Sequence, residues 1–236
     1  MSDVNIRSFL PHEKLSQKFW DEDQKLKPEV REALLNIASE FLEYLKIDVD
    51  VSDITFTGSY SNYNYTPYSD IDLHIVIEFA DVNDNEELVK GFMSAKKSYW
   101  NDKYDIEVLG AEVEIYPQDA AEEHISSGVY SIENDEWVVK PDKFQKKPNT
   151  KAAYKKFKML SDQIDDVLNS DDEKEVERIL KKIKKMRQSG LSKSGEMSIE
   201  NIAYKMLRSK NLIQKLFDKK FKLYGDSISL WLIYNL

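Results

Sequence analysis

The chain has 236 residues, a formal net charge of −9 and no cysteine, which excludes disulfide bonds and cysteine-ligated zinc sites. No apolar run approaches the roughly 20 residues that a membrane-spanning helix needs, and no secretory signal is expected because the N-terminal stretch lacks a continuous apolar segment. These features predict a globular cytoplasmic protein without a membrane partner.

The charge is divided unevenly along the chain. Residues 1–139 hold 11 Lys and Arg against 30 Asp and Glu, whereas residues 140–236 hold 23 against 13. Segregation of this kind predicts two functional halves. The acidic half suits divalent cations, and the basic half suits either phosphates or docking onto the acidic half.

The N-terminal half has mixed helix and strand patterns. Pro28 is acceptable in the first turn of a helix, and the apolar residues after it recur at three- and four-residue spacing as far as Leu45. Leu15, Phe19 and Trp20 form a short packing segment ahead of this helix. The remaining patterns predict strands at 53–57 and 70–79, a helix at 85–99, strands at 104–109 and 111–116, and a hairpin pairing 128–132 with 136–140.

The C-terminal half has helical patterns only, after a basic linker with two prolines. The predicted helices span 151–168, then from a capping box at 170–173 to about 188, and 198–223 ended by Gly225, with a flexible loop at 189–195. The chain as a whole is therefore expected to be α+β, with two domains. The predicted domains are a catalytic one over 1–145, which includes an N-terminal helical segment at 11–46, and a helical one over 150–236.

An unusual pair of acids lies in the second predicted strand, "DIDLHIVI". Side chains alternate between the two faces of a strand, so Asp70, Asp72 and His74 share one face and the aliphatic residues between them share the other. Two neighbouring carboxylates repel each other and are costly to desolvate. A hard divalent ion such as Mg²⁺, or Mn²⁺ in its place, removes that cost and prefers oxygen ligands.

A later strand, "GAEVEIY", has the same character. Glu112 and Glu114 share one face, and the larger aliphatic neighbours of Glu114 favour it as the third carboxylate. Glu112 and His74 are the reserve candidates. Three carboxylates around one or two metal ions suit in-line nucleotidyl transfer.

The loop between the first two strands offers a phosphate site. Gly58 lets the backbone come close to a ligand, and the hydroxyl of Ser59 with the following amides can bind phosphate oxygens. Tyr60 and Ser69, near the two ends of the loop, are also taken as nucleotide-binding candidates. The tyrosines of this loop either stack on a base or pack the loop onto the domain, and the sequence leaves both possibilities open.

Taken together, these motifs resemble the DNA polymerase β-like nucleotidyltransferase superfamily. The resemblance rests on Gly58, Ser59, Asp70, Asp72 and the later strand, and covers residues 50–118; other segments look like bacteriophage-encoded proteins described as nucleotidyltransferases. It implies a nucleotidyltransferase-fold mixed sheet with helices on one face, paired with a C-terminal helical domain.

The resemblance also implies an activity, which is Mg²⁺-dependent transfer of a nucleoside monophosphate from an NTP to an acceptor hydroxyl with release of pyrophosphate. Asp70, Asp72 and Glu114 would be catalytic and hold the metal. Lys205 and, beside it, Arg208 would reach the triphosphate from the helical domain. A phage-encoded protein would act in the host cytoplasm.

Other possibilities remain open from the sequence. The acceptor is unknown: a protein side chain, a small molecule, a tRNA end and a second nucleotide all fit. One alternative is a catalytically silent nucleotide-binding or protein-interaction module on the same fold. Nucleic acid is possible as a partner but not favoured, because the basic run at 178–193 has no interspersed aromatic residues and the whole chain is acidic.

Overall fold

The structure is a computed structural model that describes residues 4–123, 126–144 and 147–234, with side chains as far as residue 229. The chain divides into two compact units. One unit spans residues 11–144, and the other combines the first ten residues with residues 145–236. The first ten residues belong to the second unit because Val4 and Phe9 are buried in the apolar cluster of the C-terminal helices.

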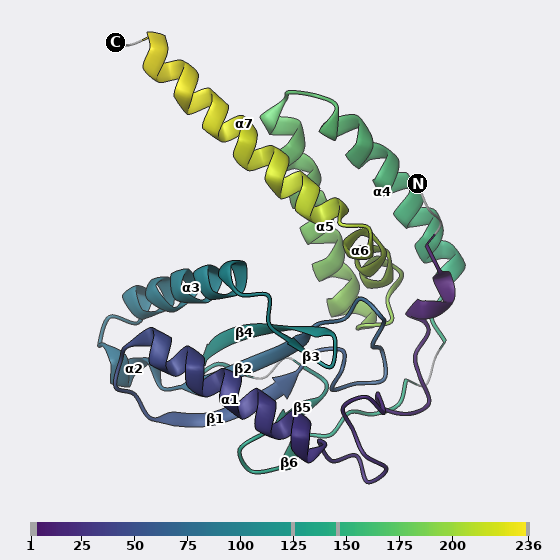
Figure 1. The fold of residues 1–236 in the computed structure, drawn as a ribbon. Helices are drawn as coiled ribbons and strands as arrows, with labels where there is room; N and C mark the ends of the chain where they lie inside the picture. Colours follow the sequence, from purple (N-terminus) through teal and green to yellow (C-terminus); the bar gives the residue numbers. More distant parts are fainter. Residues whose placement is uncertain (1–3, 124–125, 145–146, 235–236) are drawn as a thin grey trace. The chain divides into compact units, whose positions relative to one another are not determined.

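The unit of residues 11–144 is built on a mixed six-stranded sheet with the order β3-β4-β2-β1-β5-β6 (Figure 1). β2 pairs with β4 in parallel, and the other neighbouring strands are antiparallel. The strands are β1 (Val51–Thr57), β2 (Ile71–Ile77), β3 (Glu107–Val108), β4 (Ala111–Asp119), β5 (Val129–Ser131) and β6 (Glu136–Val139). The predicted strands and the predicted hairpin are thus confirmed, although β3 is much shorter than expected.

One face of this sheet carries the hydrophobic core. The alternate residues of β2 from Ile71 to Ile77 are fully buried, as the strand pattern predicted. They share a cluster with apolar residues of α1 (Pro28–Leu45) and α3 (Glu86–Lys103), while the short α2 (Phe79–Val82) adds Phe79. The expected helices on one face are therefore present, and the opposite face of β2 and β4 is left for polar side chains.

The helix α3 also completes the outer edge of the sheet. Because β3 has only two residues, it covers only the beginning of β4. Further along, the side-chain amide of Asn101 takes the place of a neighbouring strand: it accepts from the backbone N–H of Ile115 at 3.1 Å and donates to its carbonyl at 3.1 Å. The backbone next to Glu114 is thereby held by a side chain of α3.

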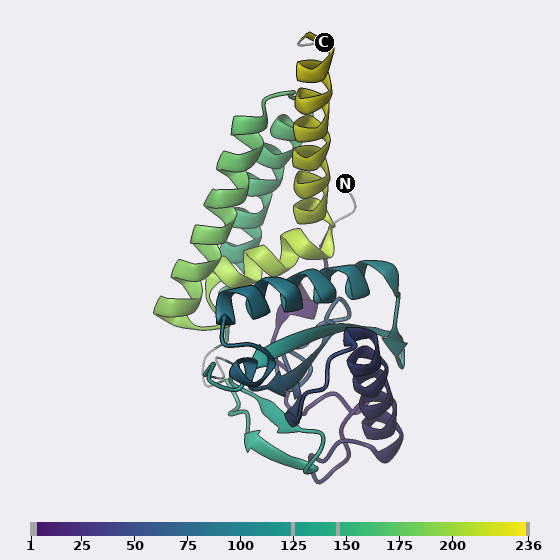
Figure 2. The ribbon, with the colours of Figure 1, turned by 90° about the vertical axis from the view of Figure 1, so that its left-hand side faces the viewer.

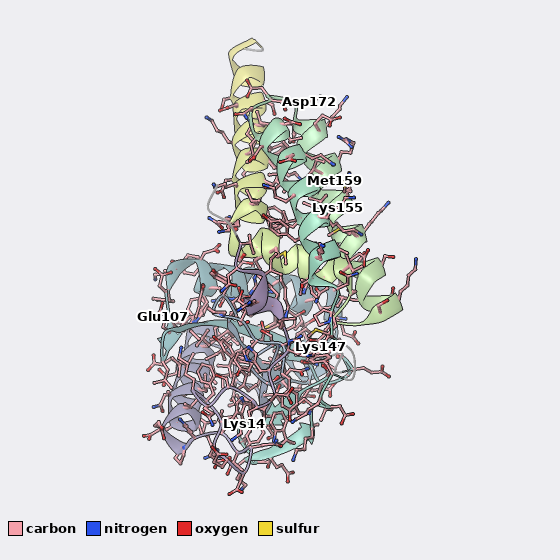
Figure 3. The ribbon with its side chains drawn as sticks, turned by 90° about the vertical axis from the view of Figure 1, so that its right-hand side faces the viewer. Lys14, Glu107, Lys147, Lys155, Met159 and Asp172 are labelled. Atoms are coloured by element: carbon pink, nitrogen blue, oxygen red, sulfur yellow. The ribbon has the colours of Figure 1, made fainter. Side chains whose placement is uncertain are left out.

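The second unit consists of the 3₁₀ helix η1 (Ile6–Phe9) and four α-helices, α4 (Thr150–Leu168), α5 (Glu173–Ser194), α6 (Ile199–Ser209) and α7 (Leu212–Tyr234). α4, α5 and α7 lie side by side, and α6 crosses near one end of them (Figure 2). Their inner faces form one apolar cluster. Lys155 and Met159, one turn apart on α4, point away from it (Figure 3).

Four expectations about these helices were wrong, two at α5 and two at α6 and α7. The cap of α5 is Asp172, whose carboxylate accepts from the backbone N–H groups of Lys174 and Glu175, and not Ser170. The predicted loop at 189–195 is helical to Ser194, because Gly190 packs closely against the start of α6 and the tertiary contact sustains the helix.

The predicted helix at 198–223 is in fact two helices. α6 ends at Ser209, and Asn211, with φ +56°, turns the chain into α7. Gly225 does not end α7, since the helix continues beyond this glycine to Tyr234. Within the described residues, no helix is both long enough and apolar enough to cross a membrane.

Candidate metal and nucleotide site

Three carboxylates meet on the polar face of the sheet. One ligand atom from each of Asp70, Asp72 and Glu114 lies within 4.8 Å of the others. The two aspartates are half-buried and Glu114 is exposed. This is the only group of three or more such side chains found among the described residues, and it consists of the three residues predicted from the strand patterns.

The register of the parallel pair explains this meeting. Asp72 of β2 lies directly opposite Glu114 of β4, and Asp70 immediately precedes β2. Glu112 is two residues earlier on β4, where its register partner is Glu107 of β3 and no residue of β2 lies opposite. Glu112 therefore lies roughly 6–7 Å from Glu114 along the strand. It is not part of the group of three carboxylates.

Gly58 directly follows β1, next to this group, and has no room for a side chain. A Cβ atom at this position would lie 1.8 Å from Oδ2 of Asp72. The backbone of Gly58 also has φ +81°, a left-handed conformation that glycine adopts without strain. The glycine thus allows the carboxylate of Asp72 to lie against the backbone that leads into Ser59.

Ser59 begins a loop whose two ends are joined by a hydroxyl pair. Its Oγ donates to Oγ of Ser69 at 2.7 Å, and Oγ of Ser69 accepts from the backbone N–H of Thr66 at 2.9 Å. Oγ of Ser61 lies 2.9 Å from the carbonyl oxygen of Gly58 and 2.8 Å from that of Gly128, the residue before β5, so its single O–H group is shared between them and links the loop to that segment. The predicted phosphate-binding residue Ser59 and the nucleotide-binding candidate Ser69 are therefore in contact, and Ser69 directly precedes Asp70.

Most of the tyrosines of this loop pack it onto the domain, and few present their rings to solvent. Tyr60 and Tyr63 are buried, and Tyr65 stacks on His12 with ring centroids 3.8 Å apart. Burial and, secondarily, the nearby carboxylate of Asp70 raise the pKa of Tyr60. The ring of Tyr60 is thus unavailable for stacking on a base, whereas Tyr68, which is 50% exposed, presents its ring to solvent.

Two residues that the sequence analysis did not place at the site support the loop. Trp20 is fully buried and its indole Nε1–H donates to the carbonyl of Tyr60 at 2.7 Å. His12 contacts the carbonyl of Tyr65 through Nε2 at 3.1 Å. The sequence marks Trp20 as a core residue, but only the fold shows that its N–H group lies next to the loop.

We expect Trp20→Phe to lower the free energy of unfolding by about 2–3 kcal/mol, because it leaves the buried carbonyl of Tyr60 unpaired and removes part of a fully buried ring. Urea denaturation measures this. Trp137→Phe is the matched control: its indole donates to the carbonyl of Gln24 at 2.8 Å in a less buried position, and we expect about 1 kcal/mol. Equal losses in the two variants would contradict the role given to Trp20.

His74 is held by a partner on β4. Its Nδ1 lies 2.7 Å from Oε1 of Gln118, whose amide nitrogen donates to the carbonyl of Glu122 at 3.2 Å. His74 shares the polar face of β2 with Asp72, as predicted, but is not in the group of three carboxylates. Its part as a reserve ligand stays a prediction.

Lys205 and Arg208, the basic residues expected to contact the triphosphate, lie on α6 of the helical unit. Lys205 is half-buried and Arg208 is exposed, while the other side of α6 packs into the helical core through Ile202, Met206 and Leu207. The helix face on which the sequence placed them is therefore observed. Their contact with a triphosphate stays a prediction.

Comparison with known proteins agrees with this arrangement. The model of a family described as "Nucleotidyltransferase domain" matches residues 38–196, about two thirds of the chain. No curated protein matches. Among solved structures, a STING-associated CdnE c-di-GMP synthase from Capnocytophaga granulosa is similar at 13% sequence identity and a TM-score of 0.23, over 85% of this chain and 84% of that one. A TM-score this low supports no conclusion about function.

Proposed function

Because the chain belongs to the nucleotidyltransferase domain family, we propose that it transfers a nucleoside monophosphate from an NTP to an acceptor hydroxyl and releases pyrophosphate. The observation that carries the proposal is the meeting of Asp70, Asp72 and Glu114 within 4.8 Å, beside the Gly58–Ser59 turn. The family match supports nucleotidyl transfer in general, and the acceptor is left open.

The three carboxylates fit a divalent cation. They provide oxygen ligands from two neighbouring strands, and their mutual repulsion would be relieved by positive charge between them. We assign Asp70, Asp72 and Glu114 as its ligands and Mg²⁺, or Mn²⁺, as the ion. Such an ion, when bound, would neutralise the triphosphate and polarise its phosphorus–oxygen bonds.

The residues of the chain would then act in defined ways. Ser59, with the amides that follow it, would bind the β- and γ-phosphate oxygens and hold the leaving group in line. The acceptor oxygen forms a bond to the α-phosphorus as the bond to the β-phosphate oxygen breaks, and pyrophosphate leaves. The proton of the acceptor hydroxyl passes to a carboxylate oxygen of Glu114.

Several finer predictions are retained without further support. They are the contact of Lys205 and Arg208 with the triphosphate, a cytoplasmic setting and a bacteriophage origin. The basic helix α5 keeps nucleic acid possible as a partner, but the acidic chain as a whole does not favour it.

The test is pyrophosphate release from each of the four NTPs with Mg²⁺ or Mn²⁺, with a panel of hydroxyl acceptors. We expect release that stops on addition of a chelator. We also expect Glu114→Gln to lower the rate about 100-fold or more, since it removes a proton acceptor and a metal ligand.

Glu112→Gln is the matched control, because it removes the same charge two residues away on the same face of β4. We expect the rate of Glu112→Gln to stay within about threefold of that of the unmodified protein, because the lost charge acts on the site only through long-range electrostatics. NTP binding without turnover under every condition would favour the silent nucleotide-binding module instead. Equal loss in the two variants would reject Glu114 as the third ligand.

A further inference from the structure

A groove in the helical unit lies between α5, α6 and α7, and no residue of the candidate metal and nucleotide site lines it. Its volume of about 510 Å³ is in the range of small-molecule sites. The large ring of Phe217 lines it and is 41% exposed, an arrangement that leaves apolar surface in water. The apolar lining residues are Leu180, Ile183, Leu191, Tyr204, Ile213 and Phe217.

The polar residues of the groove give it a net positive charge. Lys181, Lys184, Arg187 and Lys220 line it with a single carboxylate, that of Glu177, so the net charge is +3. Glu177 is shared by two of the cations: its oxygens lie 2.9 Å from Nζ of Lys220 and 3.5 Å from Nζ of Lys181. Those two lysines therefore have a partner on the protein already.

The other two cations differ in this respect. Within the part of the chain that the structure describes, neither Lys184 nor Arg187 makes an ion pair. The guanidinium of Arg187 is held over the ring of Tyr204 at 4.3 Å, and its Nε is buried without a hydrogen-bond acceptor. Lys184 and Arg187 are therefore the two cations of the groove whose charge no carboxylate among the described residues matches. The part of the groove beside Lys184 and Arg187 is thus arranged for an anion.

The shape of the groove limits the rest of the ligand. Along α5, the lining residues from Arg187 back to Glu177 cover roughly 15 Å at 1.5 Å per residue. An apolar channel of that length with cations on its rim matches an extended hydrocarbon chain that carries one acidic group. We propose that this groove binds a free organic anion of the fatty-acid class, with its carboxylate beside Lys184 and Arg187.

The test is a calorimetric titration of the full chain with laurate below its micellar concentration, in the absence of NTP. We expect saturable binding of one laurate per chain. Dodecyltrimethylammonium has the same apolar chain with the opposite charge, and acetate has the carboxylate without the chain; we expect neither to bind measurably. Because no nucleotide is present, the result is independent of the proposed nucleotidyl transfer.

Two neighbouring residues of α5 provide matched variants. Both lysines are exposed, but only Lys184 lines the groove. Lys184→Gln and Lys185→Gln therefore make the same charge change inside and outside the groove. We expect Lys184→Gln to weaken laurate binding about fivefold. Arg187→Gln should weaken it roughly tenfold, because a charge-assisted contact is lost, and Lys185→Gln should leave it within twofold.

The helical content of each variant, measured by circular dichroism, keeps a folding defect apart from a binding defect. Because Lys184 and Lys185 are both exposed, neither substitution is expected to affect folding. Three outcomes would overturn the proposal: no laurate binding, equal binding of the cationic detergent, or equal weakening by Lys184→Gln and Lys185→Gln.

Discussion

Asp72→Asn is expected to reduce pyrophosphate release about 1,000-fold at saturating NTP and Mg²⁺, which corresponds to about 4 kcal/mol of lost transition-state stabilisation. The side chain keeps its size, so the loss would come from its charge. Asp72 is the central residue of the candidate site, since it lies opposite Glu114 in the sheet and against the backbone of Gly58. Its charge is therefore in the position where a shared cation would be bound.

Calorimetric titration with Mn²⁺ gives a second reading of the same variant, and we expect at least tenfold weaker metal binding. Asp102→Asn is the control, because Asp102 is exposed on α3 and lies outside the group of three carboxylates. It should leave the rate within about twofold. A rate for Asp72→Asn above a tenth of the unmodified rate would reject Asp72 as a metal ligand.

Gly58→Ala is expected to lower the rate about 100-fold while the protein stays folded. The added Cβ would lie 1.8 Å from Oδ2 of Asp72, so the carboxylate must move by more than 1 Å. A misplacement of that size in a catalytic group costs about two orders of magnitude in rate. The positive φ adds roughly 1–2 kcal/mol of backbone strain, which thermal unfolding measures.

Gly91→Ala makes the same chemical change where nothing opposes it. Gly91 is exposed within α3, and no atom lies within 4 Å of the position of its added Cβ. We expect unchanged activity and about 0.5–1 kcal/mol of added stability, because alanine favours a helix more than glycine does. If Gly58→Ala kept full activity, the close approach of Asp72 to this turn would not be needed for the reaction.

The elements that the sequence predicted well are those with strong local patterns. Alternation along β2 identified which residues are buried and which share a polar face with Asp72, because a strand reverses its side-chain direction at every residue. The spacing of apolar residues after Pro28 identified α1 for the same kind of reason, with the helical period in place of the strand period.

The elements that it predicted poorly depend on contacts between distant residues. Gly190 and the loop predicted around it are helical, because α6 packs against that glycine. The short β3 could not be anticipated either, since Asn101 of α3 takes over the edge of β4 beyond it. The local sequence carries no information about these contacts, so the ends of the helices and strands were predicted at the wrong residues.

The candidate site shows the same division. The sequence by itself determined the residue types and their faces: a Gly-Ser turn, two alternate aspartates and a later pair of glutamates. The aliphatic neighbours of Glu114 already favoured it over Glu112, but only the tertiary structure showed why it meets the aspartates, because the parallel register of β2 and β4 brings it opposite Asp72. Likewise, only the fold revealed that Gly58 accommodates the carboxylate of Asp72. Strand alternation is a property of one segment, whereas register and close approach arise from the pairing of segments far apart in the chain.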